Sequence, residues 1–367
     1  MNSGDTWWAA SDLGWVVGHS YICYGPLISG LTTVIFEGKP VGTPDAGTYF
    51  RVIRDHHVRG MFTAPTALRA IRKEDPEAFI GKLYNTSCLQ YLFVAGEHCD
   101  YETLEWARDK LKVPVLDNWW QTETGSPMTA TCVGLGNNLY PPREVSGMPV
   151  PGWDVQVVHE EKQSPAKPGE LGRILIKLPL PPGSFSTLYK NEEKFKEIYF
   201  TKYPGYYDTM DAGMIDEYGF ISVLSREDDV INVAGHRLST SALEEAIMSH
   251  PDVVECAVFG VPDALKGEVP LGLYVMKNGT KKTSTDITKE LIALVRQLVG
   301  PVAAFRLAAP IKVLPKTRSG KIARKSISDM AKNKGIRIPT TIEDPSVYQN
   351  VKEVLNELGF ALDVLDL

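Results

Sequence analysis

One short stretch concentrates side chains that could bind a ligand. Residues 117–125 read Asp-Asn-Trp-Trp-Gln-Thr-Glu-Thr-Gly, so aromatic rings, amides, hydroxyls and carboxylates share one turn. The two indoles could wall off an apolar slot, and Glu123 is a hard oxygen ligand of the kind that Mg²⁺ prefers beside phosphates. The alternative is a capped helix start with two core tryptophans, because Thr-x-Thr-Gly turns are common.

Two further stretches place polar groups at the ends of predicted strands. Ala95-Gly96-Glu97 follows an apolar run, and its glycine would let a flat ligand approach the backbone closely. Asp211, at the edge of a β-rich segment, could bind ribose hydroxyls. The alternatives are an ordinary strand-to-helix turn for the first stretch and a solvated turn aspartate for the second.

Two basic stretches lie further along the chain. Arg226 and Arg237 flank a charged, hinge-like run, and the planar head of arginine can bond two phosphate oxygens at once. Residues 314–321 form a basic loop on which Lys321 could enter and leave a site. A P-loop is excluded, because it needs a glycine where Pro315 stands and a hydroxyl residue after the lysine. A solvated basic turn is the alternative.

The elements that would position these groups alternate between short apolar runs and helical patterns. The predicted elements are strands at 32–36, 60–64, 91–95 and 115–119 and helices at 47–57, 65–73 and 101–111. Such alternation predicts a parallel βαβ sheet. Ligands bind open sheets of this kind outside the carboxyl ends of the strands, which is where residues 117–125 would lie.

Composition changes divide the rest of the chain. Prolines between 141 and 151 mark the start of a β-rich segment. A charged run at 225–229 indicates a linker or hinge before a compact α+β segment. The expected fold is therefore α/β: a partial parallel βαβ sheet subdomain plus a β-rich subdomain, then a small mobile α+β C-terminal domain and a tail. The expected bounds are 1–140, 141–227, 228–335 and 336–367.

Composition also argues against several classes of protein. The net charge of -6 over 367 residues gives no sign of a nucleic-acid partner. Five scattered cysteines without a CxxC pair argue against a disulfide framework or a zinc site. No apolar run reaches the roughly 18 residues of a membrane span, and the first residues resemble neither a signal nor a transit peptide. The sequence leaves the oligomeric state open.

Together and in this order, the stretches resemble the adenylate-forming superfamily, and within it the AMP-forming acetyl- and propionyl-CoA synthetases. The matching stretches are 15–21, 95–97, 119–125, 211–213, 226–237 and 315–321. The resemblance implies an acid–thiol ligase that uses ATP, CoA and Mg²⁺. A short carboxylate, propionate or acetate, attacks the α-phosphate of ATP and releases pyrophosphate. The CoA thiol then attacks the acyl carbon, and AMP leaves.

The resemblance also implies a nucleotide site. Its expected ATP- and AMP-binding residues are Gly96, Glu97, Asp117, Asn118, Trp119, Gln121, Thr122, Asp211, Arg226 and Arg237. Glu123 would hold the Mg²⁺ of ATP. Lys321 would serve the first half-reaction, because its ammonium would offset the negative charge that develops between the carboxylate and the α-phosphate.

The same resemblance assigns roles to the C-terminal part of the chain. Asp228 would be the hinge about which the small domain turns between the half-reactions. The CoA contacts would come from Ala234, Gly235 and Arg296. A further metal loop would match Met248, His250 and Val253.

The acyl pocket implied by the resemblance is formed by Val16, Val17, Ala95 and Trp120. The indole of Trp120 would fill the end of the pocket and limit the acid to a short one. Ala95 stands where acetate-specific relatives carry the larger valine, which makes room for one to two methylenes at about 0.8 kcal/mol each. We therefore expect propionate to be preferred over acetate.

One family motif does not occur in this sequence. The Gly/Ser/Thr-rich phosphate loop should precede the segment that matches Trp15, so we expect the chain to be a C-terminal piece of a longer protein. The alternative function is a non-catalytic fragment that binds nucleotide, CoA or a partner chain without turnover. The resemblance implies a mitochondrial matrix location for the parent, and a cytoplasmic location stays open.

Overall fold

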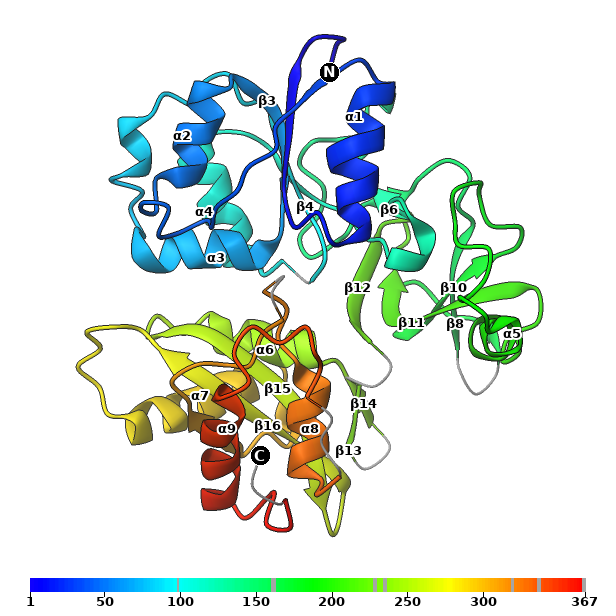
Figure 1. Cartoon of the computed structure of the whole chain (residues 1–367). Helices are drawn as coiled ribbons and strands as arrows, with labels where there is room; N and C mark the ends of the chain where they lie inside the picture. Colours follow the sequence, from blue (N-terminus) through cyan, green and yellow to red (C-terminus); the bar gives the residue numbers. More distant parts are fainter. Residues whose placement is uncertain are drawn as a thin grey trace. The chain divides into compact units, whose positions relative to one another are not determined.

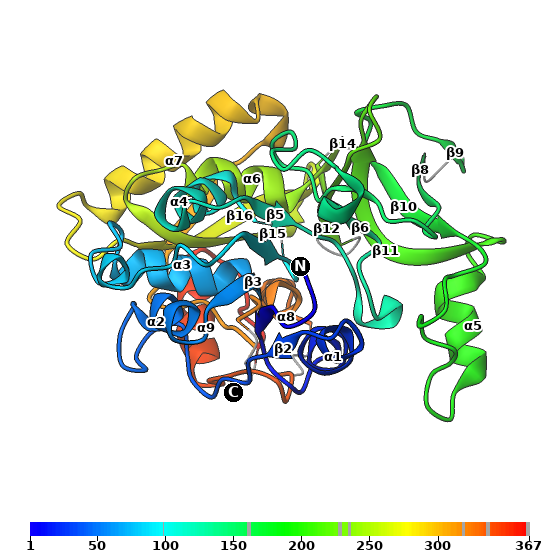
Figure 2. The ribbon, with the colours of Figure 1, turned by 90° about the horizontal axis from the view of Figure 1, so that it is seen from above.

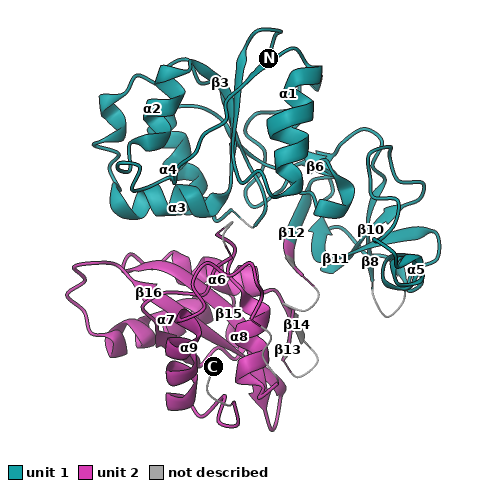
Figure 3. Cartoon of the chain, in the orientation of Figure 1, with its two compact units in different colours: residues 1–223 teal, residues 224–367 magenta. Residues whose placement is uncertain are grey.

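The computed structural model forms two compact units, residues 1–223 and 224–367 (Figure 3). The residues that the structure describes are 1–97, 99–159, 163–226, 230–233, 236–317, 320–334 and 338–364, without the side chains of 225, 232, 236 and 237.

Unit 1 opens with a parallel five-stranded sheet in the order β2-β1-β3-β4-β5. Its strands are β1 (Thr6–Ala10), β2 (Thr32–Thr33), β3 (Val58–Thr63), β4 (Tyr91–Val94) and β5 (Val115–Asp117). The parallel sheet expected from the βαβ alternation is confirmed. The sequence did not predict β1, because a central parallel strand with both faces covered shows no alternation of polar and apolar residues.

Helices cover both faces of this sheet. One face packs against α2 (Thr48–Asp55), α3 (Pro65–Glu74) and α4 (Tyr101–Leu111). The π-helix η1 (Gly18–Tyr24), continued by α1 (Gly25–Ile28), lies over the other face (Figure 1). Local chemistry fixes two of the helix starts: Pro65 occupies the first turn of α3, and Asp100 caps α4 by accepting from Thr103 N at 2.9 Å.

The rest of unit 1 is β-rich, as expected. Its sheet has the order β12-β11-β10-β8-β9. The strands are β8 (Val155–His159), β9 (Ser164–Pro165), β10 (Gly172–Lys177), β11 (Tyr206–Ile215) and β12 (Ile221–Arg226). The helix α5 (Glu192–Phe200) packs beside β11 (Figure 2). The shorter elements are η2 (Gly81–Leu83), η3 (Thr122–Thr124), β6 (Thr129–Ala130), η4 (Val133–Leu135) and β7 (Met148–Pro149).

Unit 2 is an α+β layer built on one sheet in the order β14-β13-β16-β15, with β17 parallel to β16. Its strands are β13 (Ile231–Val233), β14 (His236–Leu238), β15 (Val253–Asp263), β16 (Gly267–Met276) and β17 (Leu307–Pro310). One apolar core includes α6 (Thr240–Met248), α7 (Ser284–Leu298) and η6 (Pro301–Ala303). A second core includes α8 (Arg324–Ala331) and α9 (Val347–Glu357).

Two expectations for unit 2 change in detail. The sequence pattern predicts a helix over residues 321–330, but the observed helix α8 begins at Arg324, so Lys321 lies in the turn before it. The segment 336–367, expected as a tail, contains α9, whose Tyr348, Val351 and Leu355 are fully buried in a unit 2 core. The finer bounds expected from the sequence stay a prediction.

Candidate functional site

The polar turn 117–125 follows β5, and backbone hydrogen bonds hold its first residues. Asn118 N donates to Val94 O of the neighbouring strand at 2.9 Å, and Trp119 N donates to Thr129 O at 3.1 Å. Inside the turn, Gln121 N donates to Thr124 Oγ1 at 3.1 Å. Gly125 then takes a left-handed conformation with φ of 68°, which glycine adopts without steric cost. The turn is therefore a fixed structure at the carboxyl edge of the parallel sheet.

A bulge in β11 aims Asp211 away from the regular ladder. The pairing of β10 with β11 shifts register between Arg173 and Leu175. Opposite this shift, Met210 has φ of 57°, and its N–H donates to Asp208 Oδ1 at 3.0 Å. Asp208 is itself held by Arg173 through two bonds of 2.6 and 2.8 Å, with both side chains buried. Bulges of this kind redirect side chains near functional sites.

The bulge and the turn meet at one carboxylate. Asp211 is buried, and its Oδ2 accepts from Trp119 Nε1 at 3.0 Å and from Gln121 Nε2 at 2.6 Å. Gln121 Nε2 also donates to Thr209 O at 2.7 Å. The structure thus brings together three of the expected nucleotide-binding residues from segments about ninety positions apart.

At the start of the turn, two acceptor oxygens are buried without a hydrogen-bond partner in the part of the chain that the structure describes. They are Asp117 Oδ1 and Asn118 Oδ1. The other oxygen of Asp117, Oδ2, accepts from Ser146 Oγ at 3.1 Å. Burial raises the pKa of Asp117 to about 8, against the lowering effect of this bond. A buried acceptor without a donor is costly, so these oxygens suit a ligand that brings N–H groups.

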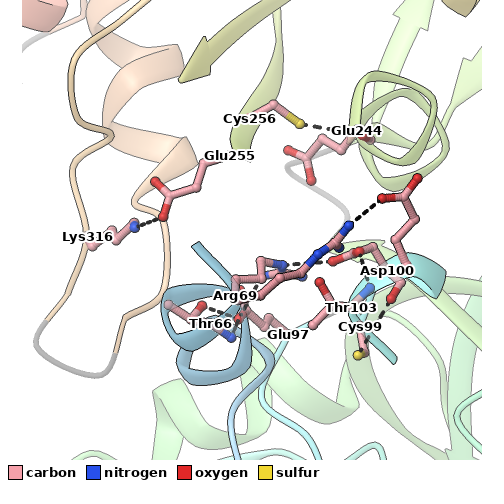
Figure 4. A network of polar contacts seen from close by, with 12 residues as sticks. Thr66, Arg69, Glu97, Cys99, Asp100, Thr103, Glu244, Glu255, Cys256 and Lys316 are labelled. Carbon is pink, nitrogen blue, oxygen red and sulfur yellow. Dashed lines mark hydrogen bonds and ion pairs between the residues drawn. The ribbon is translucent and has the colours of Figure 1, made fainter. Parts of the chain in front are cut away.

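The turn after β4 is held by a network of ionic contacts (Figure 4). Glu97 accepts from Thr66 N at 2.6 Å and from Arg69 Nη1 at 3.1 Å, while Arg69 Nε donates to Asp100 at 2.8 Å. These contacts bind the Glu97 carboxylate to α3 and to the start of α4. Gly96 has φ of 101°, so the backbone at this turn depends on glycine.

Three of the four expected acyl-pocket residues share one cluster on the η1 face of the sheet. Val17 and Ala95 are buried there, and Trp120 packs against them. The indole of Trp120 stacks on Tyr21 with ring centroids 5.0 Å apart, and it meets Phe62 edge-on at 6.0 Å. Val16 is half-buried and is not part of this cluster.

Glu123 lies on η3 and is held by residues that the sequence did not single out. Its Oε1 accepts from the hydroxyl of Tyr199 at 3.1 Å, and its backbone oxygen accepts from Phe185 N at 2.8 Å. Thr122, beside it, is exposed. Sequence patterns could not indicate Tyr199, because it meets Glu123 only through tertiary packing 76 positions away.

Lys321 lies in a tight turn of unit 2. Lys316 and Ile322 form an antiparallel bridge, and Thr317 N donates to Lys321 O at 2.8 Å. Gly320 has φ of 86°, and the Lys321 side chain is exposed. Lys316, on the same turn, lies 2.5 Å from Glu255 (Figure 4).

The remaining expected residues of unit 2 do not gather into one described site. Arg226 is exposed at the end of β12, and Arg296 is exposed on α7. Arg237 lies in β14, but its side chain is outside the described part. The expected hinge Asp228 and the expected CoA residues Ala234 and Gly235 also lie outside the described residues.

The expected metal loop has its histidine engaged. His250 Nε2 lies 2.7 Å from Glu290 Oε2, and its Nδ1 accepts from Asp252 N at 3.2 Å. Met248 ends α6 and Val253 begins β15. Within the described ranges, no three His, Cys, Asp or Glu side chains gather as a metal site. The loop stays a prediction.

Comparison with known proteins gives the family. Residues 1–183 match the model of the AMP-binding enzyme family, and residues 242–321 match the model of the AMP-binding enzyme C-terminal domain. The chain belongs to the AMP-binding enzyme family. Both family models therefore match parts of this chain, and the resemblance drawn from the motifs is confirmed.

Curated members of the AMP-binding family are similar over almost the whole chain. The human "Acyl-CoA synthetase short-chain family member 3, mitochondrial" is 58% identical over 97% of this chain and 52% of that protein. The "Propionate--CoA ligase" of Escherichia coli is 39% identical over 97% of this chain and 57% of that protein. The chain thus spans about half the length of the curated relatives it matches.

A solved structure supports the fold. The crystal structure of the anthranilate CoA ligase AuaEII in complex with anthranoyl-AMP matches with a TM-score of 0.78 and 22% identity, over 90% of this chain and 60% of that one. In the described part of this AMP-binding family member, no helix has the length and apolar content needed to cross a membrane.

Proposed function

We propose that this chain carries the nucleotide site, the acyl pocket and the C-terminal domain of an AMP-forming short-chain acyl-CoA synthetase. The enzyme joins a short carboxylate to ATP, giving acyl-AMP and pyrophosphate, and then transfers the acyl group to CoA. The observation that carries this proposal is the junction of Trp119, Gln121 and Asp211 directly beside Glu123. The names of the relatives support the substrate class.

The nucleotide binds along the turn after β5. Asp211 is fixed by two donors, and its carboxylate accepts from the ribose hydroxyls. The orphaned oxygens of Asp117 and Asn118 accept from the exocyclic amine of adenine. Guanine carries a carbonyl oxygen in place of that amine, so the same pair of acceptors disfavours it. The glycine turn at Gly96 lies after the neighbouring strand β4 and allows a flat base to approach.

The carboxylate of Glu123 fits the Mg²⁺ of ATP. Mg²⁺ keeps several waters and takes one or two protein carboxylates beside phosphates, so one half-buried carboxylate is sufficient. Bound there, the ion neutralises phosphate charge. Lys321 acts in the first half-reaction, where its ammonium stabilises the negative charge on the α-phosphate. Its exposed position on a short turn suits a residue that enters the site for one step.

The acid binds against Trp120. The indole is held by Tyr21 and Phe62, so it closes the pocket with a rigid wall. Ala95 and Val17 leave room for a propionate methyl, since each buried methylene contributes about 0.8 kcal/mol. Propionate is therefore the preferred acid over acetate.

The second half-reaction uses the C-terminal domain. Asp228 is the hinge, and Ala234, Gly235 and Arg296 contact CoA. Arg226 and Arg237 bind the ribose and phosphates of the nucleotide. The proposed enzyme acts in mitochondria, in keeping with the names of the relatives.

Propionate-dependent exchange of labelled pyrophosphate into ATP tests the proposal on the folded 367-residue chain. We expect exchange with a higher kcat/KM for propionate than for acetate, and loss of exchange in Lys321→Gln. A higher kcat/KM for acetate would contradict the pocket assignment.

A second function is favoured by the length of the chain, which is about half that of its relatives. In this alternative the chain is a non-catalytic fragment that binds nucleotide, CoA or a partner. A folded chain that binds AMP but catalyses no exchange would support this alternative and refute catalysis by the chain.

A further inference from the structure

We propose that Tyr199 is a positioning residue that sets the direction of the Glu123 carboxylate, so that the site can hold Mg²⁺ in one geometry. This proposal rests on the proposed nucleotide site. It adds a residue from α5, in the β-rich part of unit 1, to a site otherwise built on the turn after β5.

The contact holds Glu123 by its side chain while the backbone is held separately. The Tyr199 hydroxyl donates to Oε1 at 3.1 Å, and Phe185 N donates to the backbone oxygen of Glu123 at 2.8 Å. A glutamate side chain has three rotatable bonds, and a donor at one carboxylate oxygen restricts the last of them. The second oxygen, Oε2, then has a defined direction.

The hydroxyl is itself fixed by aromatic packing. The Tyr199 ring meets Phe185 edge-on at 4.9 Å and stacks on Tyr207 at 5.7 Å. Tyr207 is fully buried. A ring packed between two aromatic neighbours cannot swing away from Glu123 without opening this cluster, and aromatic pairs of this kind contribute roughly 0.5–1.5 kcal/mol each.

Tyr207 makes a similar contact with Gln121, two residues before Glu123 in the turn. Its hydroxyl donates to Gln121 Oε1 at 2.5 Å, which turns the amide nitrogen of Gln121 toward Asp211. Two stacked tyrosines therefore hold two residues of one turn. Tyr207 supports the ribose side, and Tyr199 supports the side where the metal would bind.

The expected effect follows from the demands of the ion. Mg²⁺ requires nearly ideal octahedral geometry, so a carboxylate that rotates freely binds it less well. Loss of a hydrogen bond to a metal-binding carboxylate typically weakens metal affinity about 10–100-fold. Tyr199→Phe removes one hydroxyl and keeps the ring, and Tyr207→Phe is the matched control on the other side of the turn.

The first measurement needs no ligand. Crystal structures of the wild-type chain, Tyr199→Phe and Tyr207→Phe would compare the direction of the Glu123 carboxylate. We expect one direction in the wild type and in Tyr207→Phe, and a rotated or disordered carboxylate in Tyr199→Phe with α5 and β11 unchanged. The same carboxylate direction in the wild type and Tyr199→Phe would overturn the proposal, whether or not the chain binds ATP.

The second measurement titrates Mg²⁺ against ATP binding, followed by tryptophan fluorescence. We expect Tyr199→Phe to raise the half-saturating Mg²⁺ concentration about tenfold and to leave the affinity for metal-free AMP unchanged. Tyr207→Phe should instead weaken AMP binding and leave the half-saturating Mg²⁺ concentration unchanged. Equal Mg²⁺ dependence in the wild type and Tyr199→Phe would refute the role of Tyr199. A wild-type chain that binds no nucleotide would refute the proposed function, and the comparison of Glu123 carboxylate directions would still decide the role of Tyr199.

Discussion

The indole N–H of Trp119 donates to Oδ2 of Asp211 over 3.0 Å, although the two residues stand 92 positions apart. The bond joins the turn at the end of the parallel sheet to the bulge of the antiparallel sheet. Both sheets therefore contribute to one polar junction within unit 1, and the expected ribose-binding carboxylate depends on the expected adenosine-binding turn for its orientation.

Trp119→Phe should destabilise unit 1 by about 2 kcal/mol, because the buried Asp211 loses one donor while the ring is largely kept. Urea unfolding of the full chain would measure this change. Trp120→Phe is the control, since Trp120 packs by its ring and has no such bond to Asp211. A loss in Trp119→Phe no greater than in Trp120→Phe would contradict the importance of the bond.

Met210 gives a prediction about backbone strain. Its φ of 57° lies in the left-handed region, which costs an ordinary residue about 1–2 kcal/mol. Met210→Gly removes that cost, but the greater freedom of glycine in the unfolded chain lowers stability by roughly 0.5–1 kcal/mol. The free energy of unfolding should therefore stay equal or rise slightly. Met210→Val should lower the free energy of unfolding by more than about 1 kcal/mol, since a β-branched residue fits this region poorly. Equal stability of the two variants would show that the bulge relaxes.

The raised pKa of Asp117 should make the stability of the chain depend on pH. Its pKa rises from 3.8 to about 8 on folding, so the folded state binds more protons between these values. Asp117 therefore contributes its full stabilisation below the unfolded-state pKa of 3.8. This stabilisation is lost as the pH rises through the folded-state pKa of about 8. The loss is at most about 1.4 kcal/mol per pH unit.

Asp117→Asn resembles the protonated acid and cannot ionise, so it should remove this part of the pH dependence. Denaturant unfolding of both proteins between about pH 5 and pH 8 would test it. The free energy of unfolding should fall more steeply with pH in the wild type than in Asp117→Asn. Parallel profiles would mean that the carboxylate is ionised in the folded chain.

Trp120 should determine the length of the acid. Trp120→Gly opens the space next to Ala95 and Val17, so a hexyl ester of AMP should bind more tightly relative to the propyl ester than it does in the wild type. Calorimetric titration would give the ratio of affinities, with Trp120→Phe as the matched variant of intermediate size. An unchanged ratio in a folded Trp120→Gly protein would place the acyl chain elsewhere.

The sequence was most informative where structure is local. The apolar runs before Gly96 and Asp117 predicted parallel strands, and the ends of those strands are where the expected site residues lie. The helical pattern after Lys321 was extended too far, because the pattern continues through residues that the structure holds in a turn. The bridge between Lys316 and Ile322 competes there with helix formation.

The contacts that tie the site together could not be predicted from patterns. The left-handed position in the bulge is occupied by Met210 and not by a glycine, so the sequence did not indicate the bulge. Tyr199 lies in a helix whose sequence resembles that of any amphipathic surface helix. The ion pair between Arg69 and Glu97 spans 28 positions. Such contacts depend on how sheets and helices pack, and single-sequence propensity carries little information about packing.

Binding of a stable propionyl-adenylate mimic, the propyl ester of AMP, tests the central claim most directly. Calorimetry on the folded 367-residue chain should show one site, weakened at least tenfold in Asp211→Ala and little changed in Asp109→Ala on the exposed surface of α4. A folded wild-type chain that gives no binding heat and no change in tryptophan fluorescence would contradict the claim that the turn 117–125 and Asp211 form an adenylate site.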